Sequence, residues 1–104
     1  MGKYDTDASV IRVQGEMTIY RAHELMQELI PAVGNTSRHA VLDLSQVTEL
    51  DTAGLQILLM AHRTAMARGM RLAVTHPSEC VSEVLDLCNL SALLRDDDHS
   101  AAET

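Results

Sequence analysis

The segment Asp51-Thr52-Ala53-Gly54 holds the residues of this 104-residue chain whose types and spacing are best suited to chemistry. It follows the apolar run 41–44, which reads as a strand, and precedes the leucine-rich run 55–66, which reads as a helix. Thr52 thus presents a hydroxyl at a predicted helix start, where unpaired backbone N–H groups and the helix dipole accommodate an anion. The spacing predicts a phosphorylation site at Thr52. In the alternative interpretation, Asp51 or Thr52 only caps the helix.

A phosphoryl group on Thr52 would change the charge of the surrounding surface. It adds about −1.5 to −2 charges at neutral pH, so it would repel an acidic or tightly docked partner, and binding would be switched without any refolding of the chain. The contact surface is predicted to combine the loop 46–50 with the first turn of the following helix. Its predicted partner-binding residues are Glu49, Asp51, Thr52, Ala53, Gly54, Leu55 and Gln56.

No catalytic or metal-binding constellation accompanies this segment, so we predict neither an enzyme nor a bound cofactor. The sequence contains no P-loop, GxGxxG or GxSxG motif, and it offers no evident base to activate Thr52 as a nucleophile. Cys80 and Cys88 lack the spacing of a redox pair or a zinc site and are predicted to be reduced structural residues. The histidines, which lack metal-ligand spacing, are His23, His39, His62, His76 and His99.

The composition limits the possible partners and locations. The net charge of −7 argues against a nucleic-acid backbone or an anionic membrane as partner and favours a protein with a basic surface. Hydrophobic residues make up 46% of the chain without any Phe or Trp, so the core must be aliphatic. No apolar run approaches the about 20 residues that cross a bilayer, and the first residues lack the pattern of a signal peptide. We therefore expect a cytoplasmic protein without membrane insertion.

Strand-like and helix-like segments alternate along the chain. The predicted elements are a strand over 9–14, a helix over 19–33 capped by Thr18, a strand over 40–44, a helix over 55–66, a strand over 71–74 and a helix opened by Pro77 and Ser78. This alternation predicts a single α/β domain over residues 8–94, with a central mixed sheet of about four to five strands and helices mainly on one side. The termini, 1–7 and 95–104, are predicted to be flexible.

The segment 42–55, with the sequence Leu-Asp-Leu-Ser-Gln-Val-Thr-Glu-Leu-Asp-Thr-Ala-Gly-Leu, resembles the STAS domain of bacterial anti-sigma factor antagonists and sulphate transporter tails. The resemblance extends over about residues 8–94, with Gly69 and the segment 82–90 reinforcing it. In that family a partner kinase, often the anti-sigma factor itself, phosphorylates the hydroxyl residue after the aspartate. The resemblance therefore implies that Thr52 is the phosphorylated residue.

Two departures from the family pattern bear on the partner. Many antagonists carry an acidic residue after Gly-Glu-Leu, whereas this chain continues Gly15-Glu16 with Met17-Thr18-Ile19, which implies a different recognition and adds Thr18 to the predicted partner-binding residues. The modified residue is also Thr rather than the commoner Ser.

Similar short STAS proteins also resemble stand-alone adapters of chemotaxis or phosphorelay systems and small subunits of phospholipid-transport ATPases. Two functions therefore stay open. The first is a module that resembles an anti-sigma factor antagonist, binds an anti-sigma kinase or related signalling protein, and is switched by phosphorylation of Thr52. The second is a constitutive adapter without phosphorylation. In both cases we expect a monomer or a weak dimer.

Overall fold

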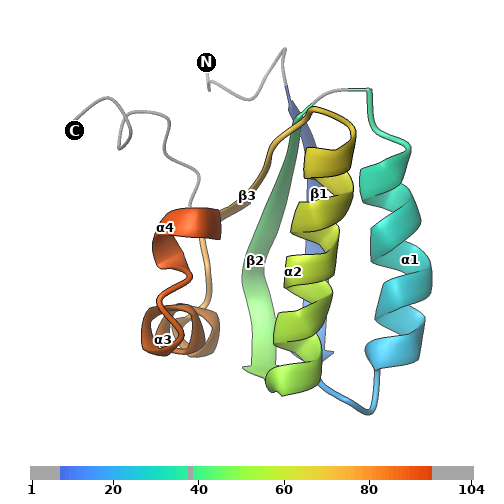
Figure 1. Cartoon of the computed structure of the whole chain (residues 1–104). Coiled ribbons are helices and arrows are strands. Elements are labelled where there is room, and N and C mark those ends of the chain that lie inside the picture. Colours follow the sequence, from blue (N-terminus) through green and yellow to red (C-terminus); the bar gives the residue numbers. More distant parts are fainter. Residues whose placement is uncertain (1–7, 38, 95–104) are drawn as a thin grey trace.

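The computed structural model describes residues 8–37 and 39–94, in which strands and helices alternate (Figure 1). The elements are β1 Ala8–Met17, α1 Ala22–Gly34, β2 His39–Leu50, α2 Thr52–Ala67, β3 Leu72–Thr75, α3 Glu79–Leu87 and α4 Ser91–Leu94. The prediction of a small α/β domain is confirmed. The termini that we predicted to be flexible, 1–7 and 95–104, lie outside the described residues.

The described residues form a sheet of three strands in the order β1-β2-β3, and both neighbouring pairs are parallel. The sheet is therefore not mixed in this part of the chain, and it has fewer strands than the about four to five that alternation suggested. Its parallel pairing has a simple cause. A helix follows β1 and another follows β2, and each helix returns the chain to the end of the sheet where the preceding strand began.

β2 is longer than the predicted strand over 40–44. The residues 45–50 are mostly polar and read as a loop, but they continue the strand because they stay paired with β1 through two register shifts. The pairing reaches Met17 of β1 and Leu50 of β2. Both strands therefore end together, at the place where α2 begins.

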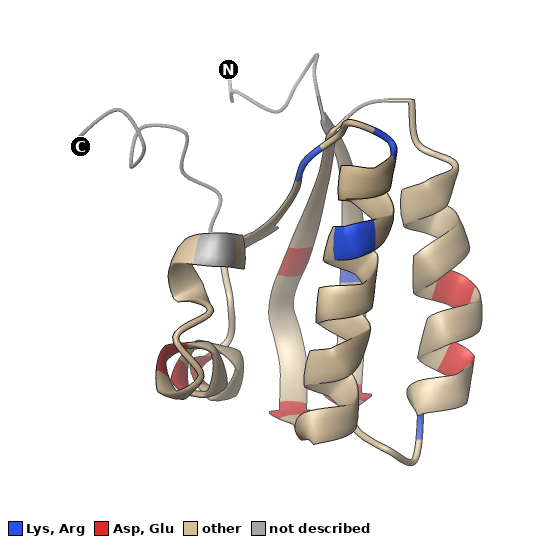
Figure 2. Ribbon diagram, viewed as in Figure 1, with Lys and Arg blue, Asp and Glu red and all other residues tan. Residues whose placement is uncertain are grey.

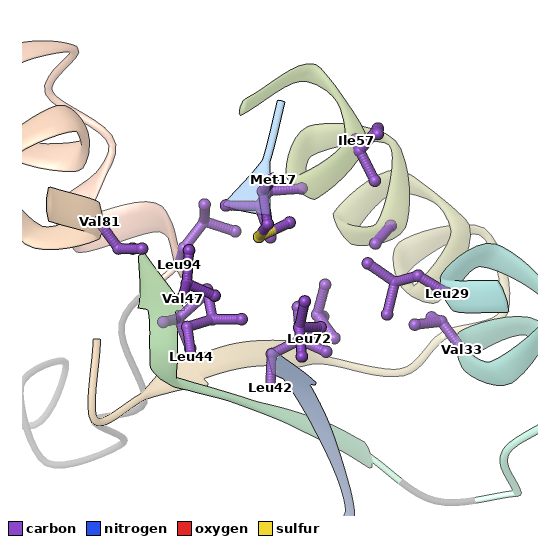
Figure 3. Packing of buried hydrophobic residues seen from close by; sticks show 14 of the residues in the cluster. Met17, Leu29, Val33, Leu42, Leu44, Val47, Ile57, Leu72, Val81 and Leu94 are labelled. Atoms are coloured by element: carbon purple, nitrogen blue, oxygen red, sulfur yellow. The ribbon is translucent and has the colours of Figure 1, made fainter. Parts of the chain in front are cut away.

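The core is aliphatic, as the composition predicted. Helices α1 and α2 lie together over the sheet, while α3 and α4 lie beside β3 and the last part of β2 (Figure 1). Met17 of β1 and Ile57 of α2 both point into the core, which fixes the start of α2 against the end of β1 (Figure 3). The largest fully buried side chains are Met17, Leu42, Leu44, Leu58, Leu94, Val33 and Val81.

Helix α1 begins later than predicted, because its N-cap is Arg21 rather than Thr18. The backbone N–H of Arg21 donates to the carbonyl oxygen of Thr18 at 2.9 Å, which closes a tight turn. Ile19 and Tyr20 therefore belong to the connection between β1 and α1. We call residues 18–21 the β1–α1 loop.

Candidate functional site

Asp51 ties the start of α2 to the β1–α1 loop. Its Oδ1 accepts the backbone N–H of Gly54 at 3.0 Å, as expected of an N-cap, and its Oδ2 accepts the N–H of Ile19 at 2.9 Å. These two N–H groups, with that of Gly54 first, hold the pKa of the Asp51 carboxyl below its ordinary value. The capping role of Asp51 is thus confirmed, and the same side chain fixes a loop distant in sequence.

Gly54 allows α2 to begin directly against the end of β1. A Cβ at this position would overlap the carbonyl oxygen of Met17 and would lie 2.8 Å from Cδ1 of Leu50. The backbone N–H of Asp51 also donates to the Met17 carbonyl oxygen, at 3.2 Å. Glycine is required here by close approach of two backbones, because any side chain would push α2 away from the sheet.

Thr52 is the first residue of α2 and is exposed. Within the part of the chain that the structure describes, its hydroxyl has no hydrogen-bond partner. Gln56, one turn later and on the same side of the helix, is exposed, as is Glu49 at the end of β2. Asp51 and Ala53 are half-buried. The start of α2 therefore carries an exposed hydroxyl that has no hydrogen-bond partner among the described residues.

Three of the predicted partner-binding residues are buried or pack against the core. Gly54 is buried, and Leu55 is half-buried and packs against the core. Thr18 is only 6% exposed, because its hydroxyl donates to the carboxylate of Glu16 and accepts the N–H of Tyr20 at 3.3 Å. These residues line the site from inside the protein, and contact of Thr18 and Gly54 with a partner stays a prediction.

Ile19 and Tyr20 belong to the same site and were not among the predicted residues. Their exposed fractions are 67% and 88%, although both are large and partly or wholly apolar. The sequence pattern placed Ile19 on the buried face of a helix. The bond from its N–H to Asp51 shows instead that it lies in the loop beside Thr52.

Carboxylates surround this site. Glu16 and Glu49 are direct neighbours in the register of β1 and β2, so two acidic residues stand side by side at the end of the sheet. Glu24 in the first turn of α1 pairs with Arg21 at 3.5 Å. Figure 2 shows acidic segments at the ends of β1 and β2 and along α1. The exposed surface at the start of α2 is therefore acidic.

The described residues 8–37 and 39–94 contain no group of three or more His, Cys, Asp or Glu residues that could hold a metal ion. None of the helices described is long and apolar enough to cross a membrane.

Cys80 is half-buried, with its thiol 3.6 Å from the carbonyl oxygen of Val47. Cys88, the C-cap residue of α3, is exposed.

Solved structures with the same fold include one of a Thermotoga maritima protein and two of SpoIIAA. A Thermotoga maritima protein described as a candidate anti-sigma factor antagonist superposes with a TM-score of 0.75 at 24% identity, covering 94% of this chain and 86% of that one. The anti-sigma factor antagonist SpoIIAA in its unphosphorylated form gives 0.69 at 18% identity, with coverages of 93% and 86%. The Bacillus SpoIIAA in its phosphorylated form gives 0.63 at 17% identity, with coverages of 93% and 89%.

The sequence itself matches part of a transporter and one family model. It is 30% identical over 60 residues to high affinity sulfate transporter 2 of Stylosanthes hamata, a match that covers 58% of this chain and 9% of the transporter. The chain thus spans a small part of that relative. The family model described as "Mlab, STAS domain" matches residues 3–95. Since that match covers nearly the whole chain and the fold agrees with it, the chain belongs to the STAS domain family.

Proposed function

We propose that this STAS domain is a non-catalytic, cytoplasmic regulatory module that binds a protein partner through the start of α2 and is released when Thr52 is phosphorylated. The partner in this proposal is an anti-sigma kinase or a related signalling protein. The observation that carries the proposal is the Thr52 hydroxyl, which is exposed and has no bonding partner in the described part of the chain. It is supported by the solved structures of SpoIIAA, which include one of its unphosphorylated form and one of its phosphorylated form.

The contacts around Thr52 favour a switch in binding over a switch in fold. Asp51 already accepts the N–H of Gly54, so the helix start is capped before any phosphoryl group is added. A phosphate dianion on Thr52 would lie beside the ionised Asp51 carboxylate, and burying it under a tightly docked partner would carry a large desolvation cost. Phosphorylation is therefore expected to expel a partner while the domain keeps its structure.

The test compares Thr52→Glu with a charge-matched control, Ser37→Glu. Ser37 is exposed and lies in the connection between α1 and β2, away from the start of α2. We expect mass spectrometry of the protein from its host to find a Thr52 phosphopeptide. Thr52→Glu should bind the partner captured by the unmodified protein at least tenfold more weakly, about 1.4 kcal/mol, and Ser37→Glu should bind it normally. Equal binding by Thr52→Glu would contradict the switch.

A second candidate is a constitutive adapter subunit of a chemotaxis or phosphorelay system or of a phospholipid-transport ATPase. The completed Asp51 cap favours it, because the start of α2 is fully formed without phosphate. The likeness to a stretch of a sulfate transporter agrees with service in a transport assembly. Stable co-purification with such a complex, at the same level for Thr52→Glu and the unmodified protein, would select the adapter.

A further inference from the structure

Two large hydrophobic side chains of the β1–α1 loop are exposed to solvent. Ile19 is 67% exposed and Tyr20 is 88% exposed, beside a helix start that carries an unpaired hydroxyl. A single exposed apolar residue is ordinary on a protein surface. Two adjacent ones in a fixed loop, one of them an aromatic residue of the type enriched in interface hot spots, indicate a contact surface.

The loop is held by hydrogen bonds to β1 and to the start of α2. Asp51 at the start of α2 accepts the N–H of Ile19, and Glu16 of β1 accepts the hydroxyl of Thr18. Arg21 Nη1 donates to the carbonyl oxygens of Gln14 at 2.7 Å and of Glu16 at 2.9 Å. A loop fixed in this way loses little conformational entropy on binding, which makes its exposed side chains effective anchors.

Arg21 binds β1 where the pairing of that strand with β2 is irregular. A register shift follows Gly15, whose φ of +84° lies in the left-handed region, and the carbonyl oxygens of Gln14 and Glu16 on either side of it both accept from Arg21 Nη1. A Cβ on Gly15 would lie 3.0 Å from Arg21 Nη1. The strand is thus shaped to hold the loop that carries Ile19 and Tyr20.

The charges around the loop indicate which kind of partner would bind Ile19 and Tyr20. Asp51 and Glu16 accept hydrogen bonds from the loop, and Glu49 is the neighbour of Glu16 in the sheet. Arg21 of the loop is already bonded to two backbone carbonyls and paired with Glu24. An anionic lipid surface or a second copy of this acidic chain would be repelled. A protein with basic side chains around an apolar pocket is complementary.

We infer that Ile19 and Tyr20 insert into an apolar pocket of the protein partner, whose Lys and Arg side chains pair with the surrounding carboxylates. This inference rests on the proposed function and gives the partner its chemistry. It also explains how added negative charge can release a basic partner. The apolar part of the interface lies against Thr52, where a phosphate would be desolvated, while the basic rim faces Glu16 and Glu49.

The first test places a photo-crosslinking benzoylphenylalanine at position 20 of the full chain in its host, with position 87 as the control. Leu87 is 84% exposed at the end of α3 and lies outside the site. We expect position 20, and not 87, to crosslink to one protein, at a peptide that combines apolar with Lys or Arg residues. No adduct at position 20, an equal adduct at both positions, an acidic target peptide or an adduct with a second copy would each overturn the inference.

The second test measures the affinity of that crosslinked partner by calorimetry. Tyr20→Ser and Ile19→Ser should each bind at least tenfold more weakly, Leu87→Ser should bind normally, and affinity of the unmodified protein should fall as salt rises. Circular dichroism checks that all variants fold. Binding by both Tyr20→Ser and Ile19→Ser within twofold of the unmodified protein, while Thr52→Glu still loses affinity, would overturn this inference alone. Unchanged binding by Thr52→Glu would instead overturn the proposed function.

Discussion

Helix α2 begins and ends in different ways. At its start, the Asp51 carboxylate joins the helix to Ile19, so one side chain organises two segments far apart in sequence. At its end, the helix closes on itself, with the N–H of Met70 donating to the carbonyl oxygen of Ala65 at 2.9 Å. The start therefore holds a surface in a fixed shape, whereas the end only terminates the helix.

The charges and exposed groups at the two ends differ as well. The start carries an unpaired hydroxyl at Thr52 and two exposed side chains in the β1–α1 loop, among carboxylates. The connections at the other end carry Arg68 and Arg71, and Arg68 donates to the carbonyl oxygen of Thr36 at 2.5 Å. The start of α2 thus has an unpaired hydroxyl and two adjacent exposed large side chains beside it, whereas the last turn of the helix has the exposed Met66. The predictions below compare matched positions at the two ends.

The largest difference in the free energy of unfolding is expected between alanine variants of Gly54, at the start of α2, and Gly69, after its end. Gly54→Ala would force a Cβ into the Met17 carbonyl, and such overpacking costs about 3 kcal/mol or more of the free energy of unfolding. Gly69→Ala has open space around it, so only its φ of +73° opposes the change, at about 1 kcal/mol. Chemical denaturation of both variants measures the two costs. Equal destabilisation would mean that the start of α2 is not held by close backbone contact.

The next largest difference in stability is expected between variants that remove the hydrogen bonds of Arg21 and of Arg68. Arg21→Met removes a guanidinium from two carbonyl oxygens and should lower the free energy of unfolding by about 2 kcal/mol. Arg68→Met removes one such bond, to Thr36, and should cost about 1 kcal/mol. Urea unfolding gives both values, and partner binding should weaken only for Arg21→Met. Weakened binding by Arg68→Met would break the distinction between the two ends.

A smaller effect concerns acid. The pKa of Asp51 is lowered in the folded protein, so its contribution to stability is complete above the unfolded value of 3.8 and is lost as pH falls through the lower folded value. Asp51→Asn keeps an acceptor for one N–H but not for both, so it should lower stability above pH 3.8. The melting temperature of this variant should also fall less steeply as the pH is lowered below 3.8.

Asp43 is the control for this pH dependence. Its pKa is also lowered, by the backbone and hydroxyl of Ser45 and by Arg12, but it lies within the sheet rather than at the start of α2. Asp43→Asn should likewise flatten part of the acid loss and should leave partner binding unchanged. Melting curves from about pH 2 to pH 7 that keep the full acid loss in Asp51→Asn would show that the Asp51 bonds contribute nothing.

The smallest effect on stability is expected at Thr52 itself. Because its hydroxyl has no bonding partner in the described residues, Thr52→Val should change the free energy of unfolding by less than about 0.5 kcal/mol. The same variant should lose all phosphorylation at this position. A thermal melt together with phosphopeptide mapping checks both, and a large loss of stability would assign Thr52 a structural role instead.

Local sequence patterns located the start of α2 because its determinants are local. An Asp cap, a hydroxyl and a glycine between an apolar strand and a leucine-rich helix are read within a few residues. The length of β2 and the position of Ile19 were missed because both depend on distant partners. The polar residues 45–50 form a strand only through pairing with β1, and Ile19 leaves the helix because Asp51, far along the chain, accepts its N–H.

The most direct test of the account is the dissociation constant of the partner for the protein carrying authentic phosphothreonine at position 52, measured beside the unmodified protein. The account predicts at least tenfold weaker binding of the phosphorylated form, with unchanged circular dichroism, because the dianion cannot be desolvated beneath the partner. An equal or lower dissociation constant for the phosphorylated form would contradict the claim that Thr52 releases a partner from the start of α2.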